Sequence, residues 1–219
     1  MIAQRSPDWY AQRLGKATAS RIADIVAKTK TGPAAGRINY AAELIAERLT
    51  GTAGPNYVSG PMQWGIDHEE AAKALYADRC GLLVQDAEFL DHPEIMWSGA
   101  SPDGYVDDGL VEVKCPNTAT HLDTLLGASI SGSHLIQMQW QMACSGRSWC
   151  DYVSYDPRLP LPMQLHVQRV HRDVSRIRPL QTKNPGRIYQ NLMILSLPAG
   201  GASYLASPGD THALSLIHI

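Results

Sequence analysis

A predicted β-hairpin near the middle of the chain places two carboxylates and a lysine close together. Asp103 lies in a Ser-Pro-Asp-Gly segment before the first strand, residues 107–109 carry the Asp-Asp-Gly turn signal, and residues 110–114 form the second strand. Glu112 and Lys114 are two apart in that strand, so their side chains point to the same face. Asp103 comes alongside from the preceding strand. This D-x8-E-x-K spacing can hold a hard divalent cation beside a lysine.

The chemistry of such a group limits what it can do. Mg²⁺ prefers a few carboxylates together with waters and a substrate phosphate oxygen. It polarises a phosphodiester, lowers the pKa of a bound water and stabilises the leaving oxygen. A lysine beside the metal can orient the attacking water or offset charge on the phosphorus. The alternative is an ordinary hairpin with a solvent-facing ion pair, because short motifs of common residues recur by accident.

Composition and length predict one soluble globular domain. A chain of 219 residues can build one domain with a real core, or at most two small ones. Hydrophobic residues make up 44% and charged residues 18%, and no run approaches the roughly 18 apolar residues of a membrane span. The four cysteines lack C-x-x-C spacing, and three histidines, His68, His121 and His134, match no zinc signature. We therefore expect free thiols in an intracellular, cytoplasmic protein.

The net charge of the chain does not by itself indicate nucleic-acid binding. The formal charge is −2, whereas phosphate contacts supply most non-specific affinity for DNA. A nuclease with this composition would need its basic residues gathered in one groove.

The periodicity predicts helices followed by a mixed sheet that helices cross. We expect helices at about 7–14, 20–26, 39–50, 60–79, 118–127 and 133–144. We expect strands at about 82–90, 95–100, 104–106, 110–114, 151–155 and 163–170, and a loop at 28–36. This order is that of a single α/β or α+β domain.

The C-terminal stretch differs from the rest. From Val174 on we find no sustained helical or strand period, and prolines punctuate the segment. We therefore assign residues 1–173 to the folded domain and expect residues 174–219 to be a poorly ordered tail. A truncated or frameshifted end would explain it, and a divergent appendage is the alternative.

Helical geometry singles out one carboxylate and one amide. On its helix, Glu69 shares a face with Ala72 and Tyr76, whereas Glu70 lies on the charged face. A carboxylate that faces the core needs a partner, and a metal is a common one. Gln139 also faces packed side chains, where it could position water or phosphate near a metal, or be a buried amide bonded to backbone groups.

Five segments in one order resemble the PD-(D/E)XK nuclease core of the phage lambda exonuclease and YqaJ-type viral recombinase family. The hairpin supplies S-P-D-G and E-V-K-C-P. The other segments are W-Y-A-Q-R-L-G with T-A-S behind it, W-G-I-D-H-E, Q-M-Q and Y-D-P-R, which start at Trp9, Thr18, Trp64, Gln137 and Tyr155. The resemblance runs from about residue 6 to about residue 173. It implies a restriction-endonuclease-like fold, with a mixed central β-sheet flanked by helices and with N-terminal helices.

The resemblance also implies a metal-dependent nuclease site. Asp103, Glu112, the Val113 carbonyl and Glu69 would hold Mg²⁺, for which Mn²⁺ can substitute. Lys114 would orient and help activate the attacking water. These assignments make the chain a candidate DNA exonuclease.

Three further residues take roles from the same resemblance. Gln139 would join the catalytic group, and Arg13 and Ser20 would bind a terminal 5′-phosphate or the scissile backbone. Arginine offers a two-pronged fork to phosphate oxygens, and a serine at a helix start adds hydroxyl and backbone donors. Taken without the resemblance, Arg13 is an exposed helix residue and Ser20 a helix cap.

The implied substrate is an end of double-stranded DNA, degraded in the 5′-to-3′ direction. The implied partner is a single-strand annealing protein, the implied assembly a homo-trimer, and the implied setting a phage or prophage in the bacterial cytoplasm, with no membrane. Two alternatives remain: another PD-(D/E)XK endonuclease or junction resolvase, and a non-catalytic DNA-binding or assembly protein on the same fold.

Overall fold

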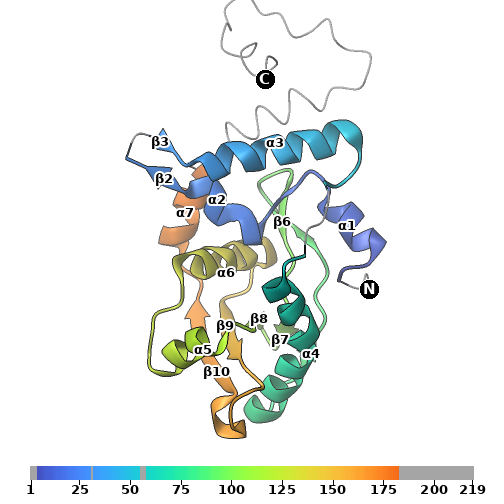
Figure 1. Ribbon diagram of the computed structural model, residues 1–219. Coiled ribbons are helices and arrows are strands. Elements are labelled where there is room, and N and C mark those ends of the chain that lie inside the picture. Colours follow the sequence, from blue (N-terminus) through green and yellow to red (C-terminus); the bar gives the residue numbers. More distant parts are fainter. Residues whose placement is uncertain (1–3, 31, 55–57, 183–219) are drawn as a thin grey trace, which may run out of the picture.

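A computed structural model describes residues 4–30, 32–54 and 58–182 (Figure 1). In this part of the chain the fold is mixed α/β, as the sequence predicted. A five-stranded mixed sheet lies between helices, and an N-terminal layer of helices with a small second sheet packs at one end of it. No helix among these residues is long and apolar enough to cross a membrane.

The central sheet has the strand order β10-β9-β8-β7-β4. Its strands are β4 (Val84–Gln85), β7 (Gly104–Val106), β8 (Gly109–Lys114), β9 (Trp149–Tyr155) and β10 (Leu165–His171). Strands β8 and β9 run parallel, with Lys114 opposite Ser154, and the other neighbours are antiparallel. The carboxyl ends of β8 and β9 therefore lie at the same edge of the sheet.

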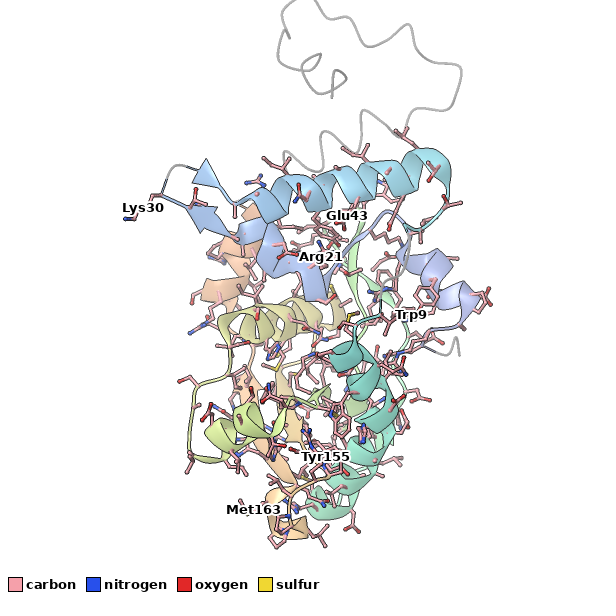
Figure 2. All side chains as sticks on the ribbon, viewed as in Figure 1. Trp9, Arg21, Lys30, Glu43, Tyr155 and Met163 are labelled. Carbon is pink, nitrogen blue, oxygen red and sulfur yellow. The ribbon has the colours of Figure 1, made fainter. Side chains whose placement is uncertain are left out.

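Two helices cover opposite faces of this sheet. Val111 and Val113 of β8 pack with the cluster that contains Ala72 and Tyr76 of α4 (Gly60–Cys80). Leu110, on the other face of β8, packs with residues of α6 (Gly132–Ser145). Because side chains alternate along a strand, Glu112 and Lys114 share the α6 face with Leu110. Helix α5 (Thr118–Leu125) and the short helix η2 (Leu161–Met163) complete this half, where Figure 2 labels Tyr155 and Met163.

The N-terminal layer packs around a second core. It contains α1 (Pro7–Arg13), β1 (Ala17–Thr18), the 3-10 helix η1 (Ala19–Arg21), α2 (Ile22–Val26), β2 (Lys28–Thr29), β3 (Gly32–Pro33) and α3 (Ala35–Thr50). Strand β1 pairs with β6 (Ser98–Ala100), which pairs with β5 (Leu90–Asp91). Ile22, Leu44 and Trp140 belong to the shared core, so α6 contacts both halves of the molecule. Figure 2 shows Trp9 on α1, and Arg21 and Glu43 where η1 faces α3.

Three expected elements before residue 92 differ in the structure. The expected loop at 28–36 forms the short hairpin β2–β3, and α3 begins at Ala35 rather than at Asn39. The expected strand at 82–90 is two short strands, β4 and β5, which belong to different sheets. Two-residue strands carry too little alternation for a sequence pattern to separate them.

The C-terminal expectation was wrong for its first nine residues. Val174–Thr182 forms helix α7, which packs against α6 and buries Ile177 and Leu180. Pro179 lies inside this helix. A single buried pair three residues apart, interrupted by a proline, gives no sustained period, which is why the sequence did not reveal the helix. Residues 183–219 of the predicted tail lie outside the described residues.

Candidate active site

The buried Glu112 is the centre of a polar cluster between β8 and α6. Its side chain is 1% exposed, and its two oxygens accept hydrogen bonds from α6: Oε1 from Gln137 Nε2 and Oε2 from Gln141 Nε2, each at 2.6 Å. Lys114 Nζ also donates to Oε1 and forms an ion pair with it. Gln137 and Gln141 reach one carboxylate because residues four apart share a helix face. The strand and the helix therefore fix the orientation of Glu112.

Asp103 lies beside this cluster, one residue before β7. Its Oδ2 accepts a hydrogen bond from Val113 N at 2.7 Å, which ties the carboxylate to β8. Its Oδ1 has no hydrogen-bond partner among the described residues. Burial and the carboxylates of Glu112 and Glu69 raise the pKa of Asp103 well above its usual value, although Lys114 acts in the opposite direction. A cation at this position would relieve the crowding of negative charge.

Lys114 keeps its positive charge in this environment. Burial alone would lower its pKa, but the carboxylates of Glu112 and Asp103 outweigh burial, so the pKa is raised. A charged lysine here can donate a hydrogen bond to a water or to a phosphate oxygen.

Glu69 approaches Asp103 from α4. It is buried, as its predicted place on an apolar helix face required, and its carboxylate pairs with Lys73 Nζ at 3.0 Å and with Arg5. Burial would raise the pKa of Glu69, but Lys73 and Arg5 outweigh it, so the pKa is lowered. Glu69 is therefore an ionised carboxylate that two cations hold.

The site fits a hard divalent cation on two carboxylates. Asp103 and Glu112 together with the Val113 carbonyl form an all-oxygen donor set of the kind Mg²⁺ takes when waters complete its shell. Oδ1 of Asp103, which has no hydrogen-bond partner among the described residues, is available as a ligand, and the raised pKa of this carboxyl shows that a cation would stabilise its ionised form. Within residues 4–30, 32–54 and 58–182, no three His, Cys, Asp or Glu side chains form a group that could hold a metal. The predicted third carboxylate, Glu69, therefore does not share such a group with Asp103 and Glu112 in this structure.

Gln139 does not lie at the cluster, contrary to its predicted catalytic role. Its Nε2 donates to His171 O and its Oε1 accepts from Asp173 N, both at 2.8 Å, so it joins the end of β10 to the start of α7. It is the buried amide with backbone partners that was the alternative interpretation. The residues that reach Glu112 are instead Gln137 and Gln141.

The cause of this error is the burial of α6 on several sides. All residues from 138 to 143 are buried, so apolar neighbours surround each of them and do not indicate which face meets the sheet. The i, i+4 repeat of two glutamines was the available signal, because it marks one polar stripe on an otherwise apolar helix.

Arg13 lies against the segment that leads into Asp103. Its Nη1 donates to Ser101 Oγ at 3.1 Å, and its guanidinium carbon lies 4.0 Å from the ring centre of Trp9, whose Nε1 also donates to Ser101 Oγ. Burial lowers the pKa of Arg13, and among the described residues this arginine has no salt bridge. An arginine held this way, with no carboxylate partner, suits an incoming phosphate.

Ser20 is exposed and lies in η1. Its Oγ is 3.3 Å from Thr18 Oγ1, and the Thr18 N–H donates to the hydroxyl of Tyr40 at 3.1 Å. Tyr40 in turn is close enough to Arg13 for each to shift the other's pKa. No hydrogen bond or ion pair joins Ser20 to Arg13 or to Asp103 in the described part of the chain.

The sequence matches the family of YqaJ-like viral recombinase domains over residues 8–148, more than half of the chain. The chain belongs to this family. The match contains Arg13, Glu69 and the whole D-x8-E-x-K hairpin. No curated protein sequence matched the chain.

Several solved structures are similar to this YqaJ-like domain. An alkaline exonuclease, LHK-Exo from Laribacter hongkongensis, has 46% sequence identity and a TM-score of 0.78 in an alignment that covers 86% of this chain and 93% of that one. The same values hold for LHK-Exo in complex with dAMP. A phage-related exonuclease from Haemophilus somnus 129PT, at 16% identity and a TM-score of 0.60, covers 82% of this chain and 95% of that one and shares the fold. The domain is thus a homologue of an alkaline exonuclease with a PD-(D/E)XK-type fold.

Proposed function

We propose that this protein is a metal-dependent deoxyribonuclease that removes nucleotides from the ends of double-stranded DNA. The observation that carries the proposal is the group of Asp103, the buried Glu112 and the partly exposed Lys114, in a domain that is 46% identical to an alkaline exonuclease. That relative has been crystallised with dAMP, and a deoxynucleoside monophosphate is the product expected of an exonuclease.

Asp103, Glu112 and the Val113 carbonyl would hold Mg²⁺, or Mn²⁺ in its place, which would polarise the scissile phosphodiester and lower the pKa of a bound water. Gln137 and Gln141 keep Glu112 in one orientation, so that little reorganisation is needed when the substrate arrives.

The remaining charges act on the water and the phosphate. Lys114 forms an ion pair with Glu112, and its ammonium group has further N–H donors for the attacking water or for a phosphate oxygen. Glu69 adds negative charge beside Asp103, as its effect on the pKa of Asp103 indicates, and would join the metal site only after release from Lys73 and Arg5.

Arg13 is the proposed anchor for a terminal 5′-phosphate, and Ser20 a second donor to the same phosphate or to the backbone next to it. What supports this is the Arg13 guanidinium, which forms no salt bridge in the described part of the chain, stacks on Trp9 and donates to Ser101, two residues before Asp103. A 5′-phosphate held there would favour degradation in the 5′-to-3′ direction.

The family supplies the wider setting of the proposal. A recombinase-type exonuclease would expose a single strand for an annealing protein, could form a homo-trimer around the duplex, and would work in the bacterial cytoplasm on behalf of a phage or prophage. These partners and this location rest on membership of the YqaJ-like family.

The test compares three DNA substrates in Mg²⁺ and in EDTA: 5′-phosphorylated linear duplex, unphosphorylated linear duplex and closed circular duplex. We expect mononucleotides from linear DNA in Mg²⁺ only, fastest from the phosphorylated ends. Cleavage of closed circles would instead favour an endonuclease. Binding without metal-dependent cleavage of any substrate would favour a non-catalytic DNA-binding protein.

A further inference from the structure

Arg158 has no role in the proposed catalytic site, but its side chain is held in one orientation. Its Nε and Nη2 donate to the two oxygens of Asp156 at 2.7 and 3.0 Å, and its backbone N–H donates to Oδ1 of the same carboxylate at 3.0 Å. Asp156 is fully buried, whereas the Arg158 side chain is 45% exposed. The carboxylate thus acts as a buried support that presents the guanidinium to solvent.

A stack of rings fixes the face of this guanidinium. Its central carbon lies 4.5 Å from the ring centre of Trp64 on α4. His68, one turn later, stacks against Trp64 at 3.7 Å between ring centres, and its Nδ1 donates to Trp64 O at 2.8 Å. A stacked, carboxylate-anchored arginine has little rotamer freedom to lose when it binds a ligand.

The stack lies at the sheet edge that carries the active site. Arg158 Nη2 also donates to Pro116 O at 3.3 Å, and Pro116 follows Lys114 by two residues. Arg158 itself follows the carboxyl end of β9, which is parallel to β8 and adjacent to it. The Nη1 group has no hydrogen-bond partner among the described residues, so its two N–H groups remain for a ligand.

We propose that Arg158, supported by Asp156 and Trp64, binds a DNA backbone phosphate other than the scissile one. Guanidinium N–H groups are the donors best suited to a phosphodiester, and a second fixed phosphate would hold the strand in line with Lys114. The proposal rests on the proposed nuclease function and adds a binding site to it. Because Asp156 offsets much of the charge, the contact is local and directional rather than a long-range attraction.

The chain contains a matched control in Arg169. This arginine bonds both oxygens of buried Asp151 at 2.8 and 3.0 Å, lies 3.5 Å from the ring centre of Trp149, and is 44% exposed. Asp151 pairs with Val111 of β8, three residues before Lys114, so this unit lies about 10 Å away along the strands. It has the same chemistry in a place where the proposal predicts no DNA contact.

The experiment measures binding of a 5′-phosphorylated duplex by fluorescence anisotropy in Ca²⁺, with the DNA checked to be intact. Arg158→Gln with Asp156→Asn is compared with Arg169→Gln with Asp151→Asn, because each pair of changes leaves the net charge unaltered. We expect about tenfold weaker binding for the first variant and unchanged binding for the second. The DNA is then scanned with single uncharged methylphosphonates along both strands.

The scan identifies the contacted phosphate. At one position, a methylphosphonate should lower the DNA affinity of wild type and of the Arg169 variant about tenfold. The same methylphosphonate should leave the DNA affinity of the Arg158 variant unchanged. Arg158→Lys keeps a cation beside Asp156 and replaces the double variant if that protein does not fold. The methylphosphonate at the same position should weaken its binding much less than it weakens wild-type binding, because an ammonium cannot bridge the carboxylate and a phosphate in one plane.

Equal methylphosphonate penalties in wild type and both Arg158 variants would overturn the inference, as would equal losses of affinity in the Arg158 and Arg169 variants. Failure of the proposed function would be visible separately, as wild type that degrades no linear DNA in Mg²⁺.

Discussion

Gln139 and Gln137 of α6 bind different partners, so we expect their substitutions to have different effects. Substitution of Gln139 should lower the stability of the fold, and substitution of Gln137 should lower the rate of catalysis. Gln139→Leu removes two hydrogen bonds of 2.8 Å and leaves the His171 carbonyl and the Asp173 N–H without partners. Each unpartnered buried group costs about 1–3 kcal/mol, and both lie near a strand end that water can reach, so we expect a loss of about 2–3 kcal/mol in the free energy of unfolding. The turnover number should stay within about twofold of wild type.

Gln137→Leu should do the reverse. Glu112 Oε1 keeps its bond to Lys114, so the stability loss should be about 1 kcal/mol or less. Loss of the amide that orients Glu112 should lower kcat by about 10- to 100-fold, which corresponds to about 1.4–2.8 kcal/mol. Urea unfolding followed by tryptophan fluorescence and mononucleotide release at saturating DNA and Mg²⁺ measure the two quantities. A catalytic defect in Gln139→Leu with normal stability, beside an active Gln137→Leu, would refute this placement of the two residues.

Three further predictions concern other parts of the molecule. Arg13→Ala should abolish most of the preference for 5′-phosphorylated over unphosphorylated ends, by raising KM for the former only; an unchanged preference would remove Arg13 from the phosphate site. Burial alone would raise the pKa of Asp156, but hydrogen bonds from Arg158 lower it to about 2, so this carboxylate stabilises the fold above pH about 4 and that contribution is lost as the pH falls towards 2. Urea titrations should therefore show a smaller acid-induced loss of stability for Asp156→Asn than for wild type across that interval, and parallel curves would contradict the assignment. A chain that ends at residue 173 should be about 3 kcal/mol less stable than one that ends at residue 182, because it lacks the two buried apolar side chains of α7; equal unfolding midpoints would show that α7 does not contribute.

Local patterns were sufficient for the parts of the site that lie on adjacent strands. The turn residues and the alternation of residues 110–114 fixed the hairpin, and with it the placing of Asp103 beside Glu112 and Lys114. The helical position of Glu69 likewise predicted its burial. In each case the relevant neighbours are fixed by strand or helix geometry alone.

What the sequence did not reveal depends on how elements cross in space. The face of α6 that meets β8 decides between Gln139 and the pair of Gln137 and Gln141, and a helix buried on several sides has no periodicity that indicates it. The pairing of Arg5 with Glu69 joins residues 64 positions apart, and no local pattern marks it. Helix α7 was missed because its stability comes from packing on α6 rather than from its own periodicity.

The central claim is that Asp103 and Glu112 form the metal site of an exonuclease, and one measurement tests it most directly. Mononucleotide release from 5′-phosphorylated linear duplex at saturating Mg²⁺ should fall about 10³-fold in Asp103→Asn, because the loss of one carboxylate from the metal removes several kcal/mol of transition-state stabilisation. The variant should remain folded, since an asparagine oxygen can still accept the Val113 N–H. Wild-type rates of release by a folded Asp103→Asn protein would contradict the account.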